Sequence, residues 1–383
     1  MKITNKTNID ELVVKAVDSN YQYTDKKYSV TSILTDYKEI ILKRRHHNDM
    51  VRDVKDMAWL MFGTAFHEYL EKQEVEWVEV KESVFNVFKR FAKDCKEEWV
   101  TSDTNGELEP HYCIKPKLKE EHLIYKCQHS EYTLTGYSDL YNLLTNEVID
   151  YKTASVNKVL YGDWDDYIKQ LKLYAMMLNS MGFPCYKGRL IVFLKDWSKT
   201  QYTRDPKNYP SSPIYQIGWN FTHQDLIDEK QWVEDYFMKL ADIENLADDE
   251  LVICNDDVRK FGRKPTFAVM KNENKRATKV LDTEAEAWEY IRYNKLDQGK
   301  DKYWVKARPA EDVRCMEYCD SCHWCNHFIK NFASVHLVNE ETGKVEMGFK
   351  SEYEAKDYME AMSDVKDFTN YKLVEIKREK EEE

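Results

Sequence analysis

Two acids and a lysine, Asp139, Asp150 and Lys152, occur close together in this chain and could carry out hydrolytic chemistry. Asp139 ends an alternating run, and after a turn the segment 148–152 reads as a second strand. Pairing of the two strands would bring the carboxylates together, and alternation along the second strand puts Asp150 and Lys152 on one face. Carboxylate oxygens bind Mg²⁺ or Mn²⁺, while a neighbouring lysine could orient or deprotonate a water and stabilise developing charge. The pattern therefore favours metal-dependent hydrolysis of a phosphodiester.

The alternative for these three residues is an ordinary one. Asp139 would be a turn residue, and Asp150 and Lys152 would be an exposed strand pair. The tripeptide D-x-K occurs by chance in many chains, so it does not by itself indicate a metal site. Further residues are needed to favour the catalytic interpretation.

Two flanking segments supply such residues. Upstream, the segment beginning at Gly63 reads as a helix start and places His67 and Glu71 on one face, where His67 could add a nitrogen ligand. Downstream, an amphipathic helix over 166–178 places Gln170 and Tyr174 on one face. Their polar groups could hold a scissile phosphate.

In chain order, the motifs G-x-x-x-H, G-x-x-D, I-D-x-K and Q-x-x-x-Y resemble those of the RecB-type branch of the PD-(D/E)XK nucleases. The resemblance runs from about Tyr28 to Trp197, and Ser138 stands where the family has a proline that is not a ligand. It implies a restriction-endonuclease-like core, a Mg²⁺ or Mn²⁺ cofactor and DNA as substrate. The implied roles are metal ligands for Asp139 and Asp150, the catalytic lysine for Lys152, an auxiliary ligand for His67, and contacts near the substrate for Gln170 and Tyr174.

The composition indicates a globular protein without membrane segments. The chain has 383 residues, enough for one large or several small domains, and no stretch approaches the length of a membrane span. The first residues lack the apolar core of an export signal. Nine cysteines without such a signal predict the reducing cytoplasm, where thiols or metal ligands are expected in place of disulfides.

Charged residues are unevenly distributed along the sequence. A net charge of −12 argues against nucleic-acid binding, since affinity for a duplex depends on neutralising phosphates. Basic residues nevertheless cluster at 43–47, 115–119 and 259–264, and we expect these clusters to line a DNA path. The alternative for each cluster is a solvated helix face. Aromatic residues make up 13% of the chain, so some rings could stack on unpaired bases, although most will be core.

The pattern of helices and strands predicts an α/β fold, with a mixed sheet flanked by helices. We expect helices over 30–46, 52–73, 83–99, 165–181 and 224–245, and strands over 122–127, 132–142, 147–152, 187–196 and 214–220. The prolines and aspartate in 199–212 predict a loop without regular structure.

The C-terminal half contains an internal repeat. At a constant offset of 68 residues, Phe267 matches Val335 and Leu281 matches Phe349. A capping box opens a helix in each copy, at 283–286 and at 351–354. We therefore predict two small ββαβ modules. The predicted domains are 1–260 for the nuclease body, 261–310 for the first module, 311–333 for a cysteine segment and 334–383 for the second module.

The cysteine segment contains Cys315, Cys319, Cys322 and Cys325. Such density in a reducing compartment favours a soft metal centre, either zinc or a [4Fe-4S] cluster. The alternative is a buried helical stripe, since the first three cysteines follow helical spacing. Several RecB-type nucleases place an additional cluster cysteine near the N-terminus. This chain departs from that pattern, because Tyr37 stands at the corresponding position.

These observations and the resemblance predict a stand-alone DNA exonuclease. The resemblance implies a role in replication, recombination or genome processing, as in phages or mobile elements. The sequence has no Walker-type phosphate loop and no recognisable base-reading helix. Double- or single-stranded DNA is the expected partner, with a replication or recombination protein as a further possible partner. Two alternatives stay open: an inactive DNA-binding or assembly scaffold with the same fold, and a nuclease directed at RNA.

Overall fold

The computed structural model describes residues 1–17, 22–89, 94–101 and 107–377, and the chain forms two compact units. The first, here called the site unit, comprises Asn5–Leu34 and Arg52–Glu244. The second, here called the cysteine unit, comprises Met1–Thr4, Thr35–Val51 and the chain from Asn245 onward. The segment Thr35–Val51 thus packs with the C-terminal half, although the sequence placed it in the nuclease body. The finer division into four domains stays a prediction.

The site unit contains most of the strands and the long helices. Its elements are α1 (Glu11–Val17), β2 (Lys27–Ser29), α2 (Val30–Ile33), a 3-10 helix (Val54–Met57), α4 (Ala58–Glu71), β4 (Val78–Val80), α5 (Glu82–Phe88), β5 (Cys95–Thr101), β6 (Leu108–Ile114), β7 (Lys117–Lys126), β8 (Thr133–Asn142), β9 (Glu147–Ala154), α6 (Val156–Tyr161), α7 (Asp165–Ser180), β10 (Lys187–Leu194), α8 (Lys199–Arg204), β11 (Ile214–Asn220) and α9 (His223–Ile243). Strand β3 (Val51–Asp53) contains the boundary between the units.

A six-stranded mixed sheet forms the centre of the site unit. Its order is β11-β10-β9-β8-β2, and β7 also pairs with β8. The pairs β9–β10 and β2–β8 are parallel, whereas β7–β8, β8–β9 and β10–β11 are antiparallel. The predicted mixed sheet flanked by helices is therefore confirmed. A smaller sheet of order β4-β6-β5 belongs to the same unit.

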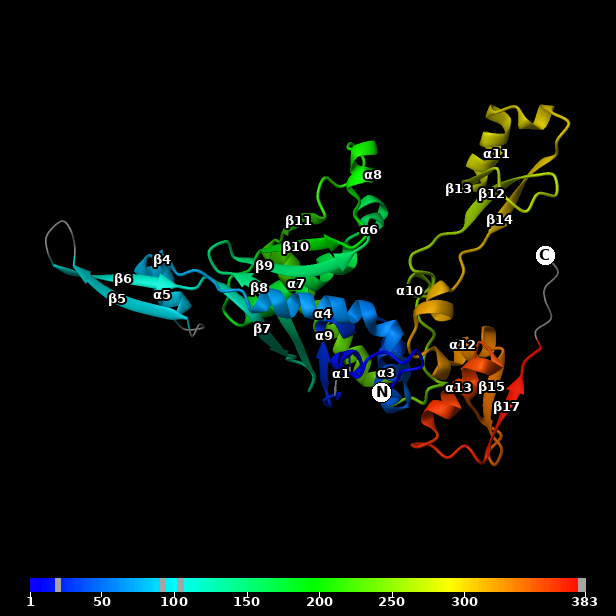
Figure 1. The fold of residues 1–383 in the computed structure, drawn as a ribbon, viewed down its shortest axis with the longest axis horizontal. Helices are drawn as coiled ribbons and strands as arrows, with labels where there is room; N and C mark the ends of the chain where they lie inside the picture. The colour runs from blue at the N-terminus through cyan, green and yellow to red at the C-terminus, as the bar shows by residue number, and fades with distance from the viewer. Residues whose placement is uncertain (18–21, 90–93, 102–106, 378–383) are drawn as a thin grey trace. The chain divides into compact units, whose positions relative to one another are not determined.

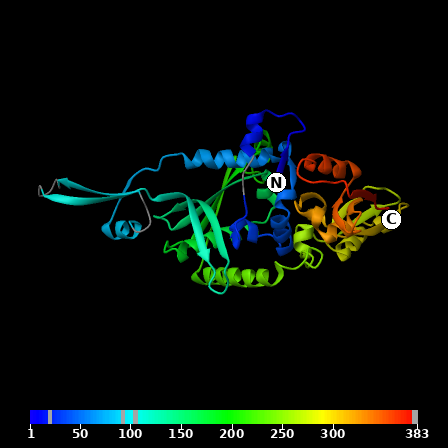
Figure 2. The same ribbon diagram turned by 90° about the horizontal axis from the view of Figure 1, so that it is seen from below.

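Helices cover both faces of the large sheet. Gly188 faces α7, because a Cβ atom added there would lie 3.0 Å from the Cβ of Leu171. Alternation puts Phe193 on the opposite face, where its ring centroid lies 4.2 Å from that of Phe66 on α4. Figure 1 shows these elements, and in Figure 2 α4 and α9 lie on opposite sides of the sheet. Side chains from α4 and α7 can therefore approach β9 from opposite faces.

Three predicted elements differ from the structure. The helix over 30–46 is broken, because Asp36 caps a new helix, α3 (Tyr37–Arg45), by accepting from Lys38 N at 3.1 Å. The helix over 83–99 is wrong in its second half, where β5 pairs with β6; residues 90–93 lie outside the described residues. The loop 199–212 contains the short helix α8, which Ser198 caps. Among the described residues, no helix combines the length and apolar character that a bilayer span requires.

The cysteine unit contains two small sheets of the same strand order, β13-β12-β14 and β16-β15-β17. Phe267 pairs with Leu281 in one and Val335 with Phe349 in the other, which preserves the offset seen in the sequence. The elements are β1 (Lys2–Thr4), α3, a 3-10 helix (His47–Asp49), α10 (Asp256–Lys260), β12 (Thr266–Lys271), β13 (Lys279–Leu281), α11 (Glu284–Tyr293), a 3-10 helix (Leu296–Gln298), β14 (Tyr303–Arg308), a π-helical turn (Arg314–Tyr318), a 3-10 helix (Cys322–Trp324), α12 (Asn326–Asn331), β15 (Val335–Asn339), β16 (Val345–Phe349), α13 (Glu352–Met362) and β17 (Tyr371–Glu375).

Candidate active site

The site is built where two neighbouring strands separate. Strands β8 and β9 pair from Asn142–Glu147 to Leu140–Ile149, and beyond that point β8 pairs with β2. Asp139 lies at this separation, and its Oδ2 accepts a hydrogen bond of 2.6 Å from Tyr151 N. A side-chain carboxylate thus satisfies a backbone N–H for which the ladder provides no partner strand. The hydrogen bond holds Asp139 against β9.

Helix α4 supplies His67. Its Nδ1 lies 3.2 Å from Asp139 Oδ1, and its Nε2 lies 3.1 Å from the carbonyl oxygen of Tyr151. Hydrogen bonding to Asp139 raises the pKa of the His67 imidazole above its ordinary value. The helix spans Ala58–Glu71, within the expected 52–73, so Gly63 lies inside it and does not mark its start. The apolar residues before Gly63 continue the helical pattern, and His67 is therefore held well inside the helix.

Glu120 on β7 is a site residue that the sequence analysis missed. The register pairs Lys119 with Leu140 and Glu121 with Ser138, so Glu120 lies across from Asp139. Its φ of 50° is in the left-handed region, an uncommon conformation that interrupts strand alternation. Burial, followed by the nearby charge of Asp139, raises the pKa of the Glu120 carboxyl. No periodic pattern marks a residue at such an irregularity.

Asp150 and Lys152 extend from β9 toward the face covered by α7, as alternation predicted. Their neighbours on β10 are Leu190 and Val192, which are fully buried. Asp150 is 2% exposed, and Lys152 Nζ lies 2.5 Å from its Oδ2. Burial raises the pKa of Asp150, and the Asp139 charge adds to this effect. Burial lowers the pKa of Lys152, but the charge of Asp150 and its hydrogen bond outweigh burial and hold the Lys152 pKa above its ordinary value.

Gln170 and Tyr174 lie on one face of α7, where Gln170 contacts Asp150 and Tyr174 contacts Gln170. Gln170 Nε2 donates to Tyr174 Oη at 3.0 Å and lies 3.5 Å from Asp150 Oδ1. Both side chains are buried, at 5% and 4% exposure. They therefore pack behind Asp150, away from solvent, an arrangement that suits positioning of the carboxylate better than direct contact with a phosphate.

An open cavity of about 540 Å³ lies beside α4 and β9. Its lining includes His67, Glu120 and Lys152 together with Trp59 and Leu60 of α4. Donor atoms of His67, Glu120 and Asp139 all lie within 4.8 Å of one another. Two carboxylates and an imidazole are a suitable donor set for Mn²⁺ or Mg²⁺. Burial raises the pKa values of Glu120 and Asp150 most, and the charge of Asp139 adds a repulsion that a bound cation would relieve.

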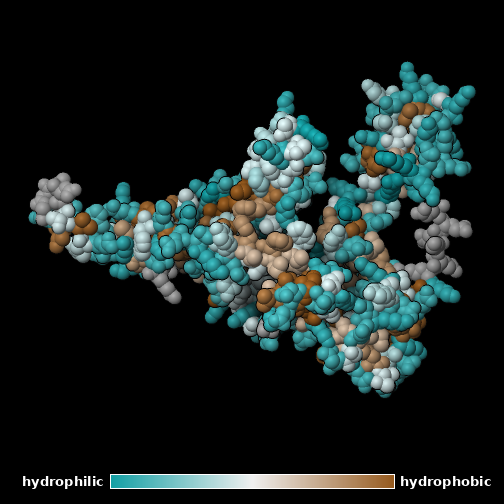
Figure 3. Space-filling view, in the orientation of Figure 1, coloured by the Kyte–Doolittle hydropathy of each residue, from teal (hydrophilic) through white to brown (hydrophobic). Residues whose placement is uncertain are grey.

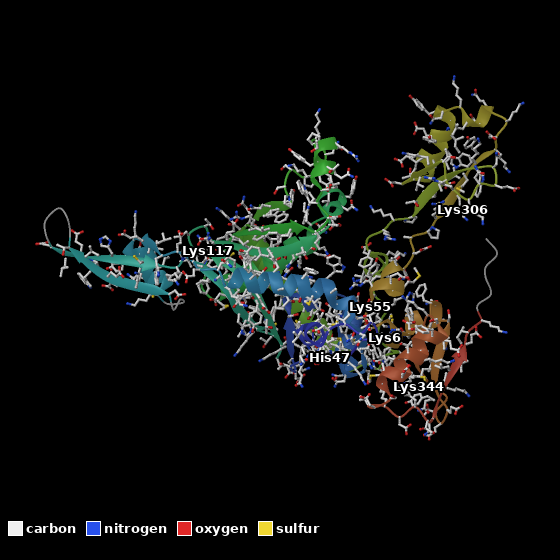
Figure 4. The ribbon with its side chains drawn as sticks, in the orientation of Figure 1. Lys6, His47, Lys55, Lys117, Lys306 and Lys344 are labelled. Carbon is white, nitrogen blue, oxygen red and sulfur yellow. The ribbon has the colours of Figure 1, made fainter. Side chains whose placement is uncertain are left out.

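The basic clusters are largely engaged by acids. In the cysteine unit, Lys43 lies 2.8 Å from Asp320, and Arg45 and His46 lie 2.5 and 2.6 Å from Asp248. In the site unit, Lys119 donates to backbone carbonyls at the end of α4. Lys117, labelled in Figure 4, begins β7 and lines a mixed-charge cavity. Lys43, Arg45 and His46 thus have acidic partners in the structure, and the expectation that this cluster lines a DNA path stays a prediction.

The cysteine unit brings five cysteines to one small cavity. Cys315, Cys319, Cys322 and Cys325 line a cavity of about 20 Å³, and Cys254 lines it as well. The chain changes direction repeatedly through this segment, from a π-helical turn to a 3-10 helix and then to α12. The alternative of one continuous helical stripe is therefore wrong. Cys254 was missed because it lies far from the others in the sequence.

The cysteines line the cavity, but their sulfur atoms do not converge on a common point. Within the described part of the chain, no three of these sulfurs lie within 4.8 Å of one another. Burial raises the pKa of the Cys315 thiol to about 12 and that of Cys319 to about 11. Lys38, whose Nζ donates to Leu251 O at 3.0 Å, also lines the cavity. These thiols would need a metal to become thiolates near neutral pH.

Comparisons with known proteins leave the family open. No protein-family model matches the chain, and no curated protein does either. Among solved structures, the crystal structure of SSO0001 is similar with a TM-score of 0.36 and 15% identity, over 60% of this chain and 84% of that one. A phage related exonuclease from Haemophilus somnus 129PT is similar with a TM-score of 0.22 and 14% identity, over 33% of this chain and 60% of that one. Similarity at this level carries no functional argument.

Gly136 on β8 offers a test of how closely α7 approaches the site. A Cβ atom added there would lie 2.9 Å from Tyr174 Cε1 and 3.2 Å from Val30 Cγ2. Gly136→Ala should therefore displace the buried Tyr174 ring and lower the free energy of unfolding by about 1–3 kcal/mol. The matched control is Gly63→Ala, where no atom lies within 4 Å and helix propensity favours alanine. Urea unfolding of both variants measures the effect, and equal stabilities would contradict the close packing at Gly136.

Proposed function

We propose that the site unit is a metal-dependent nuclease of the PD-(D/E)XK type, with a restriction-endonuclease-like core, that hydrolyses phosphodiester bonds in DNA. The observation that supports it is the convergence of Asp139, Asp150, Lys152 and His67 where β8 and β9 separate. These residues come from a helix and two strands, and His67 and Lys152 line a cavity. The geometry also adds Glu120, which the motif set did not include.

The donors divide into two groups with different roles. His67, Glu120 and Asp139 would hold Mg²⁺ or Mn²⁺, with Asp150 close enough for its pKa to respond to Asp139. Such an ion supplies charge neutralisation and water activation when bound. Lys152 faces Asp150 and stays protonated, so its ammonium would orient the attacked phosphate and stabilise charge on it. Gln170 and Tyr174 would fix Asp150 from behind.

The alternative of an inactive DNA-binding scaffold does not explain the buried acidic groups of the site. Burial of Asp150 beside other acids opposes its ionisation, and no packing benefit explains a charged cluster there. A cation-dependent reaction does explain it. We further propose that the enzyme is an exonuclease acting in DNA replication, recombination or genome processing. The hydrolytic chemistry itself does not separate DNA from RNA, so competition between labelled DNA and RNA decides the substrate.

The direct test is cleavage of end-labelled linear and closed circular DNA with Mg²⁺ or Mn²⁺. Wild type should degrade the linear DNA and leave the circle intact, whereas Asp150→Asn and Lys152→Gln should lower the rate about a hundredfold or more. Asp150→Asn removes the anion that holds Lys152 and faces the metal donors, and Lys152→Gln removes the ammonium that stabilises charge on the phosphate. The control variants are Asp228→Asn on the exposed face of α9 and Lys187→Gln at the far end of β10.

Each outcome has a definite meaning. Loss of cleavage in the site variants alone, with unchanged circular dichroism, supports the proposal. Absence of wild-type cleavage in either metal overturns it and leaves the scaffold alternative. Cleavage of the circle would overturn the exonuclease assignment while keeping the nuclease assignment.

We also propose that the five-cysteine cavity holds a soft metal centre, either zinc or an iron–sulfur cluster. Sulfur ligands surround a cavity that is lined by Cys254 and the four clustered cysteines, which provides one more ligand than either centre requires. Binding would join residues before α10 to the segment that precedes the second small sheet. The expected effect is structural stabilisation of the cysteine unit.

Metal analysis of anaerobically purified protein tests this centre. We expect about one zinc or about four irons per chain, and a brown colour in the second case. Cys254→Ser and Cys322→Ser should each lower metal content and the melting temperature, because each removes a ligand candidate. Cys113→Ser, a half-buried cysteine of the site unit, should change neither. Absence of both metals, with all five thiols titrating freely, would refute the centre.

A further inference from the structure

Helix α4 presents an unusually apolar surface to solvent. None of its residues is fully buried, and Trp59, Leu60, Phe62 and Tyr69 are 63%, 57%, 60% and 65% exposed. Figure 3 shows apolar side chains gathered over α4. Contiguous apolar patches of this kind mark binding surfaces in soluble proteins. The packing of the site unit does not explain this face.

This face continues into the candidate active site. Trp59 and Leu60 line the same cavity as His67, Glu120 and Lys152. The ring of Phe62 lies 5.7 Å from that of Trp59, measured between centroids, so the aromatic surface extends outward along the helix. A substrate that reaches His67 and Glu120 through this cavity would pass Trp59 and Leu60.

A cation accompanies the rings of this face. Lys195 Nζ lies 4.4 Å from the centroid of Trp59. The pair offers an aromatic ring and an ammonium, which suit the base and the phosphate of a nucleotide.

We infer that the exposed face of α4, together with Lys195, binds an unpaired nucleic-acid strand and leads it to the site. This inference rests on the proposed nuclease function. Bases inside a duplex stack on one another and cannot reach the rings, whereas unpaired bases can stack on Trp59 and Phe62. The adjacent ammonium group favours a polyanion over an apolar protein helix as the occupant.

Binding of a fluorescein-labelled twenty-nucleotide oligothymidine, measured by anisotropy with Mg²⁺ in the Lys152→Gln background, tests the inference. Adding Trp59→Ala and Phe62→Ala should weaken binding at least about tenfold, because two stacking surfaces are lost. The matched control adds Trp99→Ala and Leu108→Ala, side chains of 60% and 62% exposure on the small sheet of the same unit. That control should bind as the background does. A labelled duplex of equal length should bind more weakly and respond less to the α4 changes.

The outcomes separate this inference from the nuclease proposal. If wild type cleaves DNA but the α4 changes leave oligothymidine binding intact, the strand path is wrong and the nuclease proposal stands. If the α4 changes abolish binding but wild type never cleaves, strand binding stands without the nuclease. If sedimentation shows that the α4 changes convert a dimer into monomers without altering binding, the face is a self-interface and the inference is overturned.

Discussion

The separation of β8 from β9 beyond the Leu140–Ile149 pair is the constraint on which the site depends. A continuous ladder would use the Tyr151 N–H for strand pairing and leave no room for a side chain. Because the strands diverge, the Asp139 carboxylate takes that N–H, and His67 of α4 reaches both Asp139 and the Tyr151 carbonyl. One interruption in the sheet thus brings a helix, two strands and a carboxylate to the same place.

This geometry places several carboxyl groups close together, which is electrostatically unfavourable. Burial raises the pKa values of Glu120 and Asp150, and repulsion from Asp139 raises them further, while His67 and Lys152 offset part of this repulsion. Gln170 and Tyr174 restrain Asp150 from the α7 face. A bound divalent cation would complete this charge balance, which is why the arrangement favours catalysis over a structural ion pair.

The sequence predicted the parts of the site that follow periodic patterns. Alternation along β9 correctly put Asp150 and Lys152 on one face, and helical spacing correctly put Gln170 and Tyr174 together. Glu120 was not predicted as a site residue, because a positive φ breaks the strand pattern there. Cys254 was not predicted, because the fold brings it to the other cysteines from a distant part of the sequence. The ion pairs of Lys43 and Arg45 could not be predicted, since their partners, Asp320 and Asp248, are remote in the sequence.

Calorimetric titration of the metal-free protein with Mn²⁺ most directly tests the claim that the site holds a divalent cation. Glu120→Gln should weaken Mn²⁺ binding at least about tenfold, because it removes one donor from the group of His67, Glu120 and Asp139. Glu68→Gln, on the rim of the same cavity but outside that group, should bind Mn²⁺ as wild type does. Saturable binding that is lost in the first variant alone is the predicted result. Absence of saturable binding, or equal behaviour of the two variants, would contradict the account.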